Sequence, residues 1–169
     1  ELFMFKIREF KVNNIKEYCC SYTEHPSFNF SLISDDTKSI LRKAILKMNG
    51  WEIETTSQVC IVYDGDKLKP FTKYTVELYV EDNLGNHDKT TLIYETGYML
   101  TSFNGKWISD DQYKFTEKGV SPKPLIFKKH LVFNKKVKNV KVYSTAIGIY
   151  DLLLNGKKVG KKYFAPGFT

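Results

Sequence analysis

Arginine is almost missing from this sequence. Only Arg8 and Arg42 are present, although lysine and arginine together number 26 and the formal net charge is +7. Proteins that read nucleic-acid bases rely on the bidentate guanidinium group, so this scarcity argues against a nucleic-acid partner. The lysines gather where apolar residues alternate or turns occur, as on solvated strand faces: residues 128–129, 135–141 and 157–162. We therefore expect no nucleic-acid binding.

Long apolar runs are missing as well. A membrane-spanning helix needs roughly 20 apolar residues, whereas the runs here are only a few residues long. The start, residues 1–6, has no basic region, long apolar stretch or small-residue cleavage site, so it is not typical of a signal peptide. The chain does not begin with Met, which leaves open a leader removed from it. We expect a cytoplasmic protein with no membrane partner.

Cysteine is scarce, with only Cys19, Cys20 and Cys60. An odd number of cysteines cannot form a full disulfide framework, and no Cys-x-x-Cys metal spacing is present. We expect reduced, buried thiols. The three histidines are isolated in the sequence and match no ligand pattern. The sequence therefore predicts neither a metal site nor a cofactor.

Strand-favouring aromatic residues are abundant, with 12 Phe, 11 Tyr and 2 Trp. Apolar residues recur at every second position, which predicts strands, in residues 6–12, 28–32, 58–63, 74–80 and 90–96. In the third of these, Val59, Ile61 and Tyr63 share one face. Residues 82–86 have the composition of a turn. Short strands at roughly ten-residue spacing predict an all-β fold, here a β-sandwich.

Residues 40–48 are ambiguous. Leu41, Ala44, Ile45 and Met48 have the spacing of a helix face, but the segment lies between two predicted strands. This context favours a strand.

The second half returns to alternation after a polar, proline-containing stretch. It predicts strands at residues 125–133, 137–143, 148–154 and 158–164. Asn155-Gly156 separates the last two, and both residue types tolerate the positive φ that a type I′ hairpin turn requires. We expect a two-residue hairpin there.

The run from Leu68 to Val76 reads Leu-x-Pro-x-Thr-x-Tyr-x-Val and resembles the E–F corner of fibronectin type III domains. The resemblance covers about residues 5–97. It implies that Leu68 fills the core, that Pro70 stiffens the corner and that the Tyr74 hydroxyl bonds back to upstream backbone.

Residues 140–160 resemble the N-terminal β-sandwich domain of bacterial α-L-rhamnosidases. The shared pattern is Ala-x-Gly-x-Tyr, then Asn-Gly-x-x-Val-Gly, carried here by Gly148, Tyr150, Asn155 and Gly156 among others. A Pro-Gly-Trp-Thr motif follows in that family, and this chain has Pro166-Gly167-Phe168-Thr169. The order of the two resemblances also fits the family.

The family resemblance implies a division into three parts. Residues 1–97 would form a fibronectin type III-like β-sandwich, residues 98–124 a linker, and residues 125–169 the N-terminal part of the rhamnosidase jelly roll. α-L-Rhamnosidases are inverting glycoside hydrolases that release terminal L-rhamnose, and their catalytic carboxylates lie in a downstream (α/α)₆ barrel. No catalytic residue of the family maps onto this chain, so the resemblance implies a non-catalytic segment whose partner is that barrel.

A hydrolytic site would need a pair of carboxylates, because glycosidases use two carboxyl groups about 5–5.5 Å or about 6.5–9.5 Å apart. The acidic residues in question lie at expected strand ends and turns, where they ordinarily serve the backbone: Asp35-Asp36, Glu52 with Glu54, Asp64 with Asp66, Glu81-Asp82 and Asp110-Asp111. The turn oxygens of Asp82, Asn83, Asn86 and Asp88 match no calcium loop, so a plain hairpin is favoured. We expect no catalytic residue here.

Carbohydrate contact is the main alternative role, since sugar C–H faces pack on aromatic rings. The candidates are Trp51, Trp107 and Phe168. The competing interpretation is that Trp51 caps the sandwich and that the other two pack between domains. A free-standing carbohydrate-binding or adhesion module is therefore the rival to the accessory segment.

The second unit offers about four strands, whereas a jelly roll has about eight. We therefore expect the domain to be cut short at Thr169, leaving an open edge and an apolar face that carries Val140, Val142, Leu152 and Leu154. Such a face favours self-association through the second unit.

Overall fold

The computed structural model describes residues 4–16, 19–21, 23–99, 103–110, 124–160, 163 and 165–166. It contains strands and, in these ranges, no helix. The chain divides into two compact units, residues 1–103 and residues 104–169. The predicted boundaries at residues 97 and 124 stay predictions.

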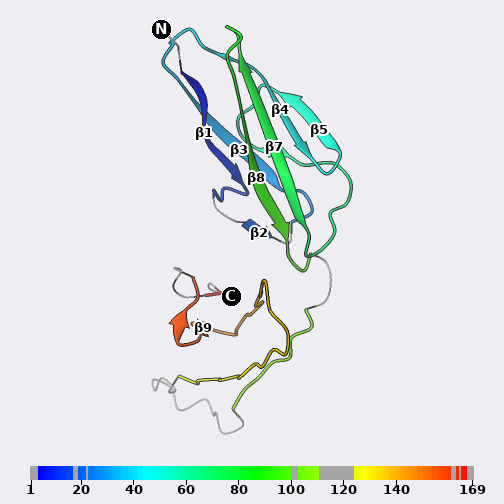
Figure 1. Ribbon diagram of the computed structural model, residues 1–169, viewed down its shortest axis with the longest axis vertical. Helices are drawn as coiled ribbons and strands as arrows, with labels where there is room; N and C mark the ends of the chain where they lie inside the picture. The colour runs from blue at the N-terminus through cyan, green and yellow to red at the C-terminus, as the bar shows by residue number, and fades with distance from the viewer. Residues whose placement is uncertain are drawn as a thin grey trace. The chain divides into compact units, whose positions relative to one another are not determined.

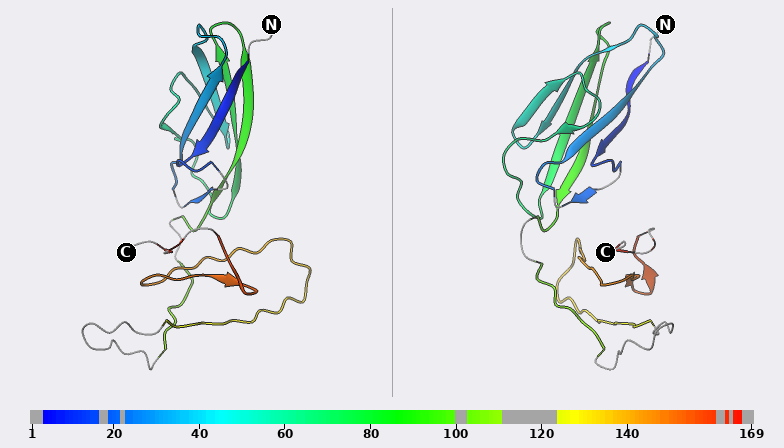
Figure 2. Two further views of the ribbon diagram at one scale, coloured as in Figure 1. Left: turned by 90° about the vertical axis from the view of Figure 1, so that its left-hand side faces the viewer. Right: turned by 180° about the vertical axis from the view of Figure 1, so that it is seen from behind.

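The first unit is a sandwich of two sheets (Figures 1 and 2). One sheet has the order β1-β3-β6 and the other the order β2-β8-β7-β4-β5. All pairs are antiparallel except β2 with β8, which is parallel. The strands are β1 (Phe5–Val12), β2 (Cys19–Ser21), β3 (Ser27–Ser34), β4 (Leu41–Met48), β5 (Trp51–Thr55), β6 (Ile61–Val62), β7 (Lys73–Asp82) and β8 (His87–Thr96). The predicted all-β sandwich is confirmed.

The core fills the space between the two sheets. Successive side chains of a strand point to opposite faces, so the alternating residues of β7 send one set inward. Val76, Leu78 and Val80 are almost completely buried, as are Phe28 from β3 and Leu46 from β4. The alternation in the sequence thus identifies the inner face of the larger sheet.

Residues 41–48 form a strand rather than a helix. Strand β4 bonds β5 on one side and β7 on the other, and Ala44, Leu46 and Met48 point into the core. Helical spacing was present, but pairing on both sides satisfies the backbone groups of this segment. The preference for a strand is confirmed.

The predicted strand at residues 58–63 is wrong in its first half. Only β6, Ile61–Val62, is a strand, and Val59 is 62% exposed while Ile61 and Tyr63 are buried. Cys60 has φ of 53°, which breaks the extended backbone and turns Val59 away from the inner face. The same kink leaves Cys60 exposed with a free thiol, so the expectation of buried thiols is wrong for this cysteine.

A tyrosine corner lies before β7. The Tyr74 hydroxyl accepts a hydrogen bond of 2.7 Å from the Lys69 backbone N–H, and Leu68 is 2% exposed beneath it. Phe71, between Pro70 and Thr72, has φ of 54°, and its N–H donates to the Gly97 carbonyl at 3.1 Å. The corner therefore joins the start of β7 to the chain that follows β8.

The second unit contains one hairpin and is otherwise irregular where it is described (Figure 1). Strands β9 (Leu153–Leu154) and β10 (Lys157–Lys158) pair across Asn155 and Gly156, whose φ values are 50° and 79°. These angles are those of the two-residue turn expected from the sequence. The strands predicted at residues 125–133 and 137–143 are wrong for this structure, because no described residue pairs with them and alternation alone does not make a strand.

We expect Tyr74→Phe to destabilise the first unit by about 1–2 kcal/mol, because the Lys69 N–H would lose its acceptor in a part-buried place. Urea denaturation of the full chain measures this change. Tyr163→Phe is the control, since that side chain is 76% exposed and belongs to the second unit, and a loss below about 0.5 kcal/mol is expected there. Equal midpoints for Tyr74→Phe and the parent chain would contradict the structural role of the corner.

Candidate carbohydrate-contact site

Trp51 opens β5 and is half-buried. Its ring centroid lies 6.3 Å from that of Phe28 and 5.2 Å from that of Tyr63, the latter pair meeting edge to face. Its indole Nε1 donates a hydrogen bond to the Asp64 carboxylate. A side chain on Gly65 would collide with Trp51 and Tyr63, so this glycine is needed for the close approach. These contacts use much of the indole surface for packing, and a sugar contact of Trp51 stays a prediction.

A shallow depression of about 290 Å³ lies beside the β4–β5 turn. Its walls include Glu52 and Glu77, which flank Lys47 across neighbouring strands. The Lys47 ammonium lies 2.9 Å from the Glu52 carboxylate. A glycosidase acid must be kept protonated by burial or by another carboxylate, whereas here a cation stands between the two acids on an open sheet face. This arrangement lacks the environment of a hydrolytic pair.

Trp107 is the most open aromatic candidate, with 70% of its surface exposed. Phe168 lies outside the described residues. A separate aromatic cluster closes the first unit: Tyr98 meets Phe71 at 4.9 Å and Phe103 at 5.1 Å between ring centroids. The sequence candidates are therefore not brought together by any described contact.

The other residues singled out for structural roles lie mainly in the second unit. Gly148 has φ of 98°, a conformation that favours glycine. Tyr150 forms a bridge with Ala165, the residue before Pro166, and its hydroxyl donates to the Ser144 carbonyl at 2.9 Å. Gly167 lies outside the described residues.

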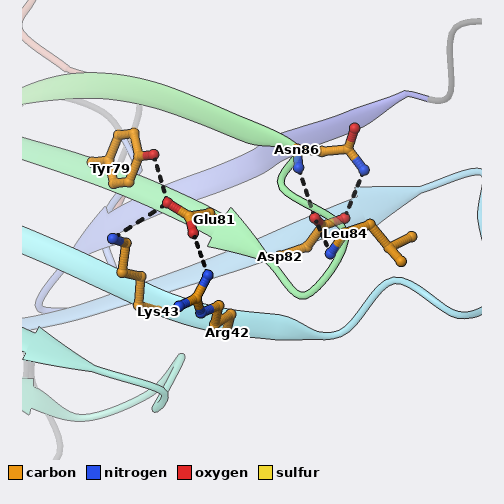
Figure 3. A network of polar contacts seen from close by, with 7 residues as sticks. All are labelled: Arg42, Lys43, Tyr79, Glu81, Asp82, Leu84 and Asn86. Carbon is orange, nitrogen blue, oxygen red and sulfur yellow. Dashed lines mark hydrogen bonds and ion pairs between the residues drawn. The ribbon is translucent and has the colours of Figure 1, made fainter.

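Asp82 closes the turn between β7 and β8 (Figure 3). Its carboxylate accepts hydrogen bonds from the backbone N–H groups of Leu84 and Asn86, from the Asn86 amide and from the Ser39 hydroxyl, at 2.7–2.9 Å. Burial alone would raise the pKa of Asp82, but the hydrogen bonds from Asn86, Ser39 and Leu84 together lower it. These bonds occupy both carboxylate oxygens, so Asp82 holds the turn.

Glu81 lies on the opposite, outer face of the sheet (Figure 3). Its carboxylate accepts a hydrogen bond of 3.0 Å from the Tyr79 hydroxyl and pairs with Lys43 at 3.3 Å and Arg42 at 3.1 Å. The hydrogen bond from Tyr79, and then that from Lys43, lower the pKa of Glu81, while burial raises the pKa of Tyr79. These contacts favour the charged form of the Glu81 carboxylate, which forms an ion-pair network with Lys43 and Arg42 on the surface.

The sequence predicted that Asp82 serves the backbone at a turn, and the structure agrees, whereas the Glu81 network was missed. The Asp82 turn had a usable signal, since Asp followed four residues later by Asn can close a turn through its side chain. The Glu81 network had no such signal in the sequence, because Lys43 and Glu81 become neighbours only through the register of β4 and β7.

No described helix is long and apolar enough to cross a membrane.

The comparisons with known proteins bear on these two units. Residues 135–169 match the family model of the alpha-L-rhamnosidase N-terminal domain. The chain is similar to the N-terminal region of bacterial α-L-rhamnosidases. This confirms the family resemblance inferred from the sequence.

Relatives extend the match beyond that segment. An α-L-rhamnosidase of Formosa agariphila is 27% identical over 138 residues, 70% of this chain and 14% of that protein. An α-L-rhamnosidase of Streptomyces avermitilis is 47% identical over 36 residues, 21% of this chain and 4% of that protein. A crystal structure of a Streptomyces avermitilis α-L-rhamnosidase complexed with L-rhamnose aligns with a TM-score of 0.56 and 20% identity, over 63% of this chain and 12% of that one. This chain thus spans a small part of these α-L-rhamnosidases, and the structural likeness shows the fold.

We expect Asp82→Asn to destabilise the chain by about 1.5–3 kcal/mol at pH 7, because an amide cannot accept all the hydrogen bonds of the carboxylate. The pKa of Asp82 is lowered on folding, so its contribution is complete above the ordinary Asp pKa of 3.8 and is lost as the pH falls below it towards the folded-state value. Urea midpoints at pH 7, 5, 3.5 and 2.5 should therefore converge for variant and parent. Asp66→Asn, an exposed site, is the control, and a pH-independent gap would contradict this role.

Proposed function

We propose that this chain is the non-catalytic N-terminal β-sandwich segment of an α-L-rhamnosidase, an inverting glycoside hydrolase that releases terminal L-rhamnose. The observation that carries the proposal is the family match of residues 135–169 together with relatives that extend into the first unit. In this role the segment supports a catalytic domain of the same polypeptide and contributes to the entrance of its active site.

The proposal includes the nature of both units. The first would be fibronectin type III-like, supported by the Tyr74 corner and by the sheet orders β1-β3-β6 and β2-β8-β7-β4-β5. The second would be the start of a jelly roll, supported by the Asn155-Gly156 hairpin within the family match. The free thiol of Cys60 supports a reducing, cytoplasmic location.

The carboxylates of the described residues support a non-catalytic role. Asp64 holds the Trp51 indole, Asp82 closes a turn and Glu81 is bound by two cations and a tyrosine hydroxyl. Asp36 accepts the Lys38 backbone N–H at 2.8 Å, again as a turn residue. Each of these four carboxylates is engaged by contacts within its own unit, which argues against a role for them as nucleophile, acid or base.

We expect the purified chain to show no turnover of p-nitrophenyl α-L-rhamnopyranoside. Release of p-nitrophenol is followed by absorbance, with an intact α-L-rhamnosidase as the positive control. Turnover that co-purifies with the chain through two further columns and disappears in a Glu52→Gln, Glu77→Gln double variant would overturn the non-catalytic assignment.

Carbohydrate binding is the second candidate, favoured by the 70% exposure of Trp107. If Trp107 stacks on sugar, L-rhamnose should change its fluorescence in a saturable way, since stacking alters the surroundings of the indole. A Trp51→Phe variant should keep this signal and Trp107→Phe should lose it. If the fluorescence of the parent chain and of Trp51→Phe does not change up to about 50 mM L-rhamnose, this candidate is removed.

A further inference from the structure

The corner before β7 and the chain that leaves β8 are joined by contacts that lie outside both sheets. Strand β8 ends at Thr96. The next residue, Gly97, is buried, and Tyr98 and Met99 are half-buried. The polypeptide therefore stays on the first unit beyond the end of its last strand. We call residues 97–99 together with Phe103 the exit segment.

Hydrogen bonds connect the corner to this part of the chain. The Thr96 N–H donates to the Thr72 carbonyl at 3.0 Å, and the Thr72 N–H donates to the Thr96 hydroxyl at 2.9 Å. The Thr96 hydroxyl in turn donates to the Lys69 carbonyl. The Phe71 N–H donates to the Gly97 carbonyl at 3.1 Å, which carries the connection one residue past β8.

The backbone at this junction has a conformation that its residue types disfavour. Seven non-glycine residues with positive φ occur among the described residues, and four of them are asparagines, which tolerate it. The other three are Cys60, Phe71 and Met99. Phe71 in the corner and Met99 in the exit segment have φ of 54° and 53°. Such strain persists only where surrounding contacts hold it.

The side chain of Phe71 contacts the exit segment. Phe71 is 48% exposed and lies outside the core, so burial in the sandwich does not explain a large apolar residue here. Its ring meets that of Tyr98 edge to face, with 4.9 Å between centroids, and Tyr98 meets Phe103 at 5.1 Å. Met99 packs against the core. Aromatic pairs of this geometry stabilise beyond the area that they bury.

The corner has a fixation of its own that does not involve the Phe71 ring. The Tyr74 hydroxyl accepts the Lys69 N–H at 2.7 Å, and the Thr72 hydroxyl donates to the Pro70 carbonyl at 2.9 Å. If Phe71 only turned the chain, glycine or asparagine would do so at lower cost. The ring and the N–H of Phe71 thus both serve the exit segment.

We propose that Phe71 is a latch that holds the exit segment on the first unit, so that freely moving chain begins after Phe103 and not after Thr96. Opening the latch releases residues 97–103, and seven extended residues reach up to about 25 Å. The corner therefore sets the length of the free connection that follows the first unit. This holds independently of the proposed function, because it concerns contacts within the first unit alone.

The test is limited proteolysis of the full chain with chymotrypsin, which cuts after aromatic residues. Cleavage of a folded protein requires local release of the chain. The initial rate of the cut after Tyr98, measured by mass spectrometry, is divided by the rate for a free peptide of residues 94–103. We expect this ratio to rise at least about tenfold in Phe71→Asn, because asparagine tolerates the left-handed backbone but lacks the ring.

Two further variants separate the latch from a general loss of stability. Val59→Asn removes another exposed apolar side chain of the first unit, 62% exposed, and should leave the ratio unchanged. Tyr98→Leu breaks the ring pair without touching the corner and should match Phe71→Asn, each variant being compared with its own peptide. The double variant should add nothing further, since both changes remove the same contact.

Urea midpoints show whether each variant has folded, and Tyr98→Leu keeps the test open if Phe71→Asn has not. Two results would overturn the proposal. One is a parent chain that is cut after Tyr98 as fast as the free peptide, which would show that the exit segment is not held. The other is a parent-like ratio in folded Tyr98→Leu, which would show that the ring pair is no latch and that the backbone and Met99 hold the segment alone.

Discussion

The register of strand β7 is the constraint on which the first unit depends. This strand bonds β4 on one side and β8 on the other, and its inward residues supply the middle of the core. A slip by one residue would turn every buried side chain of β7 outward. Both ends of the strand are fixed by side chains: Tyr74 holds the backbone of the preceding corner, and Asp82 holds the turn that follows. The hydrogen bonds of Tyr74 and Asp82 thus help to keep β7 in the register that buries its apolar side chains.

The two units differ in how much of their backbone is paired in sheets and in how many of their apolar side chains are buried. Among the described residues of the first unit, eight strands form two sheets that enclose a continuous core. In the second, the described strands are two residues long, and apolar side chains such as Ile126 and Ile147 are 91% and 88% exposed. Tyr150 and the Asn155-Gly156 hairpin provide local order without a core. The stability of the described chain therefore resides in its first unit.

The sequence predicted those features that depend on neighbouring residues. The alternation of β7, the turn after it and the Asn155-Gly156 hairpin all arise from local patterns, and the tyrosine corner from a short motif. The kink at Cys60 could not be predicted, because a positive φ at a cysteine is imposed by bonds from outside the segment, such as that from its N–H to Asn29. The strands expected at residues 125–133 and 137–143 failed for a related reason, since a strand requires a partner that a single segment cannot specify. The Trp51 contacts with Phe28 and Asp64 likewise depend on strands far apart in the chain.

The parallel pairing of β2 with β8 has a mechanical consequence. Cys19 lies opposite Tyr94 and Ser21 opposite Thr96, so the chain enters this pair at one end and leaves it at the other. A force that pulls residues 19 and 96 apart loads the hydrogen bonds between the two strands in shear, so that they must break together. In an antiparallel hairpin pulled at its two ends they would open one after another. Under a load applied at these two residues, the short parallel pair therefore breaks as one unit and does not open step by step.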